Sequence, residues 1–276
     1  TSQNPPSDWP HFMSTGVAAP TGYEREVKRV LLLERLREVN ALVGYTRVEA
    51  PEETSDPDER PPMADLTRGT TEWVPANEVH GEGIFIEFNE SIIQSWENGA
   101  HVAERDRTLF AGHQGWRNAR HLKPDGGFPP SRYTMLHTIA HLLVRELALE
   151  CGYNAASIRE RVYASSDPQA PMAGILLYTA AADSDGTLGG LIDLGKPEFL
   201  GRLLDQALER ASICSSDPLC AEHDPSKDRS LHAAACHSCT FVSETSCERG
   251  NRYLDRALVI ATLKDSEASL FRERGA

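Results

Sequence analysis

The sequence lacks three features that would place it in a common class of proteins. No apolar run approaches the roughly 20 residues of a membrane-spanning helix, and no signal peptide is visible, so we expect a cytoplasmic protein without a membrane anchor. Basic residues are also scarce, with 28 Lys and Arg against 41 Asp and Glu, for a net charge of −13. That charge fits poorly with a nucleic-acid-binding surface, so any DNA contact should be local, and Arg105 to Lys123 is the best candidate for it.

The motifs of nucleotide-binding enzymes and hydrolases are missing too. The glycine-rich run "DGTLGGL" that ends at Leu191 has neither a G-K-[ST] element nor G-x-G-x-x-G spacing, and no G-x-S-x-G elbow occurs. His137 and His141 have the spacing of H-E-x-x-H proteases, but Thr138 stands where the general base should be. We interpret both histidines as core or interface residues, and we expect that the chain is not an enzyme.

Hydrophobic patterning predicts a mixed α/β (α+β) fold, with a central sheet packed by helices. The strongest helix signal is "SRYTMLHTIAHLLVRELALECG", where Ser131 could act as N-cap, Gly152 ends the helix, and apolar residues, Cys151 among them, cover most of the circumference. The other expected elements are strands at 79–89 and 172–182, helices at 90–110 (interrupted at Asn98-Gly99), 154–164 and from Pro197, loops at 50–62 and 183–191, and an amphipathic last element at 252–263; residues 24–39 fit either a helix or a strand.

The break "KPDGGFPP" predicts a division into two domains. Residues 1–128 would form an N-terminal arm and a smaller mixed lobe. Residues 129–276 would form a second domain, with a cysteine-rich segment at 214–251.

Five of the six cysteines lie in that segment, at positions 214, 220, 236, 239 and 247. Structural disulfides are rare in the cytoplasm, and an odd number of thiols cannot pair fully, so clustered cysteines indicate a metal site. We predict that Zn²⁺ is bound by Cys220, Cys236, Cys239 and Cys247, with the C-x-x-C turn at its centre. Cys214, His232 or His237 could replace one of the four ligands. Four sulfurs leave no open coordination position, so the site would be structural.

Several of these runs also resemble a known family. "LHTIAHLLVRELALECGYNAASIRERVY", "GILLYTAAADSDGTLGGL" and "AACHSCTFVSETSCERGNRYLDRAL" resemble the zinc-binding domain of MrfA-type DNA helicases, and more specifically its version in the DrmB subunits of DISARM phage-defence systems. The resemblance implies a metal bound by the cysteines, and it places Asn251 and Asp255 at polar family positions after the last cysteine. It also implies that this chain is the C-terminal half of a longer protein.

Two functions from different classes follow from these observations. In the first, the chain is a non-catalytic, zinc-stabilised module of a DrmB-like subunit that binds a helicase partner (DrmA-like) and assists DNA engagement. The competing hypothesis is a metal-dependent hydrolase acting on nucleic acid or nucleotides. It would need an open metal position built with His137, His141 or Glu146.

Overall fold

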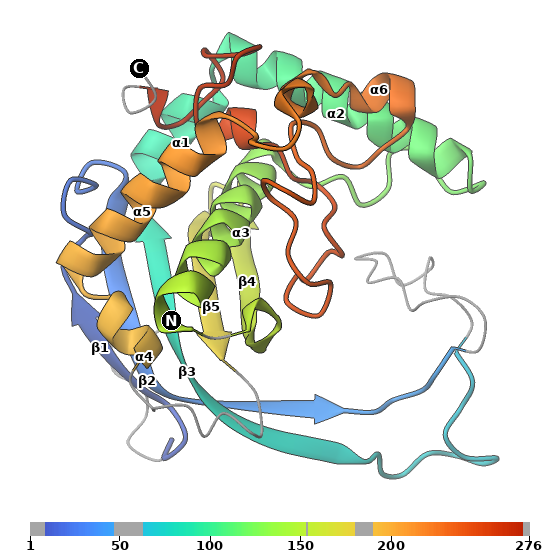
Figure 1. Cartoon of the computed structure of the whole chain (residues 1–276). Helices are drawn as coiled ribbons and strands as arrows, with labels where there is room; N and C mark the ends of the chain where they lie inside the picture. The colour runs from blue at the N-terminus through green and yellow to red at the C-terminus, as the bar shows by residue number, and fades with distance from the viewer. Residues whose placement is uncertain (1–8, 47–62, 153, 180–189, 273–276) are drawn as a thin grey trace.

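The computed structural model describes residues 9–46, 63–152, 154–179 and 190–272. Within these ranges, five strands form one sheet in the order β1-β2-β3-β5-β4, and each neighbouring pair is antiparallel (Figure 1). The strands are β1 (Met13–Val17), β2 (Val27–Ala41), β3 (Ala76–Phe88), β4 (Ile158–Ser165) and β5 (Met172–Thr179).

Helices cover one face of this sheet, with α3 directly over β4 and β5 and with α5 beside α3 (Figure 1). The helices are α1 (Glu90–Glu97), α2 (Ala100–Asn118), α3 (Ser131–Cys151), α4 (Gly190–Leu194), α5 (Pro197–Ser212) and α6 (Pro225–Asp228), with short 3-10 turns η2 (Ala155–Ser157), η3 (Pro218–Glu222) and η4 (Arg256–Leu258). The predicted fold class, a mixed α/β fold with a central sheet packed by helices, is confirmed.

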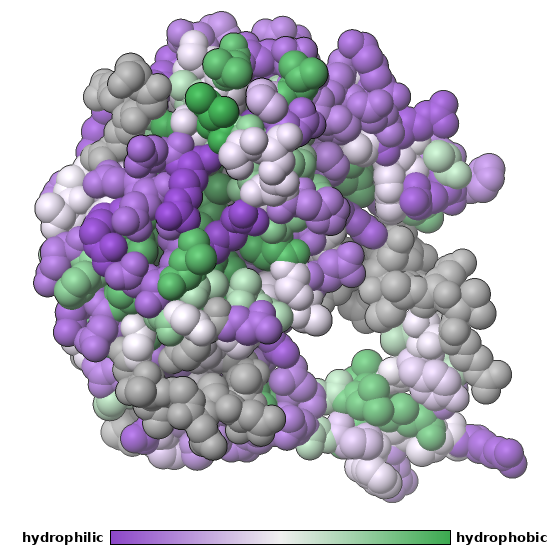
Figure 2. All heavy atoms as spheres, in the orientation of Figure 1, coloured by the Kyte–Doolittle hydropathy of each residue, from purple (hydrophilic) through white to green (hydrophobic). Residues whose placement is uncertain are grey.

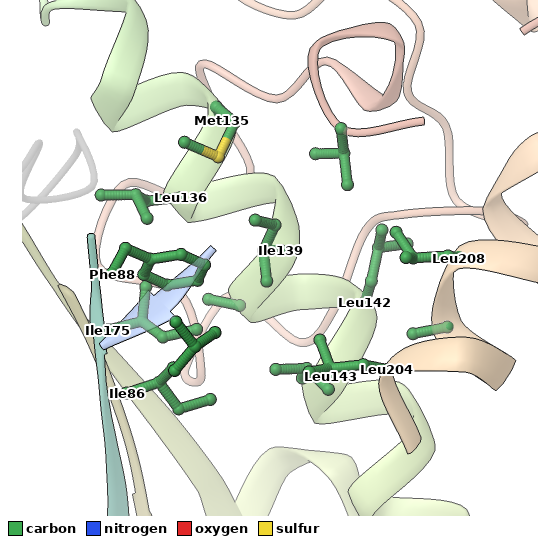
Figure 3. Packing of buried hydrophobic residues seen from close by; sticks show 14 of the residues in the cluster. Ile86, Phe88, Met135, Leu136, Ile139, Leu142, Leu143, Ile175, Leu204 and Leu208 are labelled. Carbon is green, nitrogen blue, oxygen red and sulfur yellow. The ribbon is translucent and has the colours of Figure 1, made fainter. Parts of the chain in front are cut away.

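The hydrophobic core lies between the sheet, α3 and α5. Figure 3 shows Ile86 and Ile175 of the sheet facing Ile139 of α3, while Leu143 of α3 meets Leu204 of α5. Helix α3 is therefore buried on nearly its whole circumference, as its sequence predicts. Gly152 ends it in the left-handed conformation (φ 67°), which a residue without a Cβ adopts at little cost.

The outer halves of β2 and β3 form a two-stranded arm. Strand β1 pairs with residues 30–35 of β2, and β5 pairs with residues 83–87 of β3. Beyond those positions, residues 36–41 of β2 pair with residues 76–81 of β3, and the recorded strand pairs give this part no further neighbour. Figure 1 shows this arm extending away from the helices.

The structure corrects three expectations about local structure. The helix predicted at 154–164 is wrong: after η2 the chain forms β4, because pairing with β5 overrides the weak helical pattern. The last element, 252–263, is mostly irregular and buried at nearly every position rather than amphipathic, and its only regular turn among the described residues is η4. Ser131 is the first residue of α3 rather than its N-cap, and its hydroxyl donates a hydrogen bond to Asp106.

Other expectations agree with the structure or lie outside it. The segment 24–39, which fits either a helix or a strand, forms a turn at 24–26 followed by β2 from Val27, and the interruption at Asn98-Gly99 separates α1 from α2. The loop at 50–62 and most of the glycine-rich loop at 183–191 lie outside the described residues. The division into two domains near residue 128 remains a prediction, and the sheet contains strands from both sides of that point. No helix of the described ranges is long and apolar enough to cross a membrane.

Candidate metal centre

Four cysteine sulfurs converge at one point of the C-terminal segment: those of Cys214, Cys220, Cys236 and Cys239. The Sγ···Sγ distances are 3.6 Å from Cys214 to Cys236, 3.6 Å from Cys236 to Cys239 and 3.8 Å from Cys220 to Cys239. A tetrahedron with Zn–S bonds of about 2.3 Å has edges of about 3.8 Å. The thiols are free rather than joined as disulfides. The four residues, called the cysteine tetrad below, therefore fit a closed zinc site.

Two short backbone turns bring these sulfurs together. Cys214 follows the end of α5, and Asp217 then caps η3 by accepting a hydrogen bond from the Leu219 amide at 3.0 Å, which places Cys220 in that turn. In the second turn the amides of residues 240 and 241 both donate to the Cys236 carbonyl at 3.0 Å. That turn brings the Cys236 and Cys239 sulfurs to the same side.

A buried guanidinium lies against the tetrad. Arg256 is 1% exposed and donates to the Cys220 sulfur at 3.0 Å and to the Ala211 carbonyl at 2.7 Å. Burial raises the pKa of the Cys220 thiol, so this sulfur needs a cation close by to remain a thiolate. Burial opposes ionisation of Cys214 as well, yet hydrogen bonds from the backbone of Asp217 and Ser216 outweigh it and lower the pKa of that thiol. Arg256 offsets part of the negative charge that four thiolates would bring to zinc.

The structure places Cys247 apart from the other predicted ligands. Its sulfur lies 3.1 Å from Nε2 of His137 and groups with His137, His141 and Glu160, whereas Cys214 takes the fourth place in the tetrad. Cys247 follows a turn in which the Ser246 amide donates to the Ser243 carbonyl at 2.9 Å, and it is buried beside His137 of α3. The predicted ligand set remains a prediction. The geometry groups three of its members with Cys214, which the sequence leaves open as a replacement for one of the four.

The two histidines considered as substitute ligands do not join either cluster. His232 stacks on His223 and meets Phe241 edge-on, and exposed His237 also packs on Phe241. Their role here is to pack the segment around the tetrad.

The two polar positions after the last cysteine hold the loops in place. The Asn251 side chain exchanges two hydrogen bonds of 3.0 Å with the backbone of Val242, and Asn251 itself has a left-handed φ of 61°. Asp255 is 1% exposed, caps η4 through the Ala257 amide and forms a bidentate ion pair with Arg105 at 2.7 and 2.8 Å. Arg105 is thus committed to the interior rather than displayed in the basic stretch 105–123.

The residues of the hydrolase hypothesis are only partly brought together. His137 and His141 are adjacent and fully buried. Glu146 lies elsewhere on α3 and forms an ion pair with Arg210 at 3.0 Å. The carboxylate that does meet the histidines is Glu160, in a segment whose sequence predicts a helix.

One residue links the two clusters. The hydroxyl of Thr240 lies 3.2 Å from the Cys239 sulfur, while its carbonyl lies 3.1 Å from Nδ1 of His141. Arg145 of α3 also donates to the carbonyls of Ser238 and Phe241, so the C-x-x-C turn is attached directly to the central helix. Nothing in the sequence pattern points to Thr240, Glu160 or Arg256, because each meets its cluster only through the fold.

Comparison with known proteins agrees with this geometry. Residues 139–240 match the family described as MrfA Zn-binding domain, and this range includes all four tetrad cysteines but not Cys247. The chain is also 38% identical over 259 residues to the DISARM protein DrmB of Bacillus paralicheniformis. That alignment covers 92% of this chain and 44% of the relative, so the chain spans less than half of the relative's length.

Proposed function

Because the chain is homologous to DrmB over most of its length and carries an MrfA Zn-binding domain, we propose that it is a zinc-stabilised, non-enzymatic module of a DrmB-like subunit in a DISARM-type phage-defence complex. It would bind a helicase partner and help to guide DNA. The observation that carries the proposal is the cysteine tetrad inside the matched domain. Four sulfur ligands at tetrahedral spacing leave no position for substrate, as expected of a site that holds structure.

The arm of β2 and β3 offers a surface for the protein partner. Large hydrophobic side chains stay exposed on the arm and on the segments that continue it, and Figure 2 shows a green group at this projecting part of the molecule. Val39 (55% exposed) lies in the arm itself. The segments that continue the arm carry Leu42 (50%), Val43 (64%), Tyr45 (45%), Met63 (42%) and Trp73 (73%). A cluster of this kind on a protruding element is typical of a protein-binding surface. With a net charge of −13, the chain favours a protein contact over a broad DNA contact.

Capture of the helicase subunit by the purified protein, with and without DNA, tests the proposal. We expect capture without DNA by the wild type, loss of capture with Trp73→Ala and Val43→Ser combined, and unchanged capture with Leu263→Ser, an equally exposed apolar residue (75%) away from the arm. Failure of the wild type to capture a helicase would reject the partner assignment. Chelator-sensitive cleavage of DNA, lost in His141→Ala, would instead support the metal-dependent hydrolase.

A further inference from the structure

The second cluster, formed by His137, His141, Glu160 and Cys247, is buried beneath the cysteine segment. One ligand atom from each residue lies within 4.8 Å of all the others. The two histidines project from successive turns of α3, the glutamate from β4 and the cysteine from the loop that follows the tetrad. Exposed fractions are 0% for both histidines, 2% for Glu160 and 8% for Cys247.

Backbone carbonyls set the orientation of both imidazole rings. Nδ1 of His137 lies 3.2 Å from the Tyr253 carbonyl, and Nδ1 of His141 lies 3.1 Å from the Thr240 carbonyl. A carbonyl only accepts, so each Nδ1 carries the proton and donates it. Both Nε2 atoms therefore face the centre of the cluster. Metal-binding histidines are held in the same way, by a hydrogen bond from the ring nitrogen that does not bind the metal.

Both imidazole rings aim at the same carboxylate oxygen in the centre of the cluster. Nε2 of His137 lies 2.8 Å and Nε2 of His141 lies 3.2 Å from the same Oε1 of Glu160. If the Nε2 atoms carry no proton, their lone pairs point at a carboxylate oxygen. If only one Nε2 carries a proton, that ring donates to the carboxylate while the other ring still turns its lone pair toward the same oxygen. A cation at the centre would be held by both rings and the carboxylate at once. The other carboxylate oxygen, Oε2, is buried and has no hydrogen-bond partner among the described residues.

The loop around Cys247 is shaped to hold a thiolate. The amides of Arg249 and Asn251 donate to its sulfur at 3.4 and 3.2 Å. In the same loop the chain adopts left-handed conformations at Gly250, Asn251 and Tyr253, with φ of 57°, 61° and 57°. Such conformations are unfavourable for residues other than glycine, so the surrounding contacts must stabilise them.

We propose that these four residues bind a second metal ion, a divalent first-row transition ion of which zinc is the best fit. Two imidazoles, one thiolate and one carboxylate form a donor set that zinc accepts in tetrahedral geometry. The charges balance, since one thiolate and one carboxylate neutralise a dication in a buried site. A tetrahedral ion needs ligand atoms about 3.3–3.6 Å apart. The recorded distances of 2.8, 3.1 and 3.2 Å lie within about 0.5 Å of that range, and no pair of ligand atoms is more than 4.8 Å apart. The site is closed, and its role is to join α3, β4 and the C-terminal loop. This inference stands independently of the proposed function.

Metal analysis of single variants of the purified full chain tests the second site. We expect Cys247→Ser and Glu160→Gln each to lose one equivalent of zinc relative to the wild type while the tetrad keeps its ion. Cys236→Ser should lose the tetrad ion. Cys151→Ser is the matched control, because this half-buried thiol on α3 lies outside both clusters and should leave the zinc content unchanged. Unchanged zinc content in folded Cys247→Ser and Glu160→Gln would overturn the proposal.

Zinc-edge X-ray absorption on the wild-type chain covers the case in which these variants do not fold. We expect imidazole nitrogens at about 2.0–2.1 Å in addition to sulfur at about 2.3 Å. The tetrad alone would contribute only sulfur. A shell made of sulfur alone, in protein that carries a full complement of zinc, would show that the histidines bind no metal and would overturn the proposal.

Discussion

The cysteine tetrad and the buried His-Glu-Cys cluster are neighbours, but their ligands are distributed differently along the sequence. All four tetrad ligands come from residues 214–239, a stretch with little regular structure. The other cluster collects its ligands from residues 137 to 247, through a helix, a strand and a loop. An ion in the tetrad folds its own segment, whereas an ion in the second cluster would fasten that folded segment to the core. The tetrad would thus be a short-range cross-link and the second cluster a long-range cross-link, and both would stabilise the same loop-rich region.

The charges of the two clusters differ as well. Four thiolates around zinc leave an excess of negative charge, and buried Arg256 lies against one of the sulfurs. The second cluster is neutral when a dication is bound. The recorded ion pairs of its Glu160 are with the two histidines of the same cluster. We therefore expect the metal affinity of the tetrad to depend on Arg256. The metal affinity of the second cluster should depend on its own four ligands.

The most damaging single change should be Cys239→Ser. Structural zinc contributes about 10–16 kcal/mol in zinc-finger peptides, and three thiolates retain only part of that free energy. We expect loss of the tetrad ion and melting of residues 214–241, seen as fast hydrogen exchange there, while the sheet remains protected. If the variant kept both its zinc content and its thermal stability, Cys239 would not be a ligand.

A cavity in the core should cost less, and the cost should not depend on metal. Leu143 is 0% exposed and packs against Leu204 of α5 (Figure 3). Leu143→Ala should lower the free energy of unfolding by about 2–5 kcal/mol. Chemical denaturation with and without a chelator measures this. The variant should lose the same free energy of unfolding with and without the chelator. A loss seen only without the chelator would mean that the core and the metal segment unfold as one unit.

Arg256→Gln should weaken metal binding at the tetrad without removing a ligand. Changes to groups that support metal ligands typically reduce affinity about 10–100-fold. Competition with a chromogenic zinc chelator measures the change. Arg210→Gln is a suitable control because that arginine is exposed and pairs with Glu146 instead of a cysteine. Equal affinities in the Arg256 variant and the wild type would show that the guanidinium does not stabilise the thiolates.

The smallest of these effects should come from Asn251. Asn251→Ala removes two hydrogen bonds to Val242 and forces alanine into a left-handed conformation, so we expect a loss of about 1–2 kcal/mol. Asn251→Gly loses the same hydrogen bonds but tolerates the backbone, and should be less destabilised. Thermal unfolding of the pair separates the two causes. A glycine variant less stable than the alanine variant would show that backbone strain is not important there.

Sequence reasoning succeeded where a pattern is local. The burial of α3, the break at Asn98-Gly99 and the C-x-x-C turn can each be read from a few adjacent residues. It was wrong where pairing across the chain decides. Residues 158–165 carry a weak helical pattern, yet they form an edge strand because β5 provides a partner. No local pattern marks that pairing.

The same distinction between local and long-range features applies to the metal ligands. Cysteine spacing predicts three of the four tetrad residues, whereas the placement of Cys214 in the tetrad and of Cys247 outside it depends on the path of the chain. The spacing of His137 and His141 marks the pair, but its carboxylate partner Glu160 comes from a strand whose local sequence pattern predicts a helix. A ligand set spread over 110 residues, from His137 to Cys247, leaves no compact motif.

Thr240 has a consequence for how the ions would be loaded. Its hydroxyl contacts a tetrad sulfur and its carbonyl orients His141. The first ion to bind, at either cluster, would immobilise Thr240. The second ion should then bind with higher affinity, because Thr240 is already ordered. Chains supplied with less than their full share of metal would then sort into empty and doubly filled molecules, with few in between.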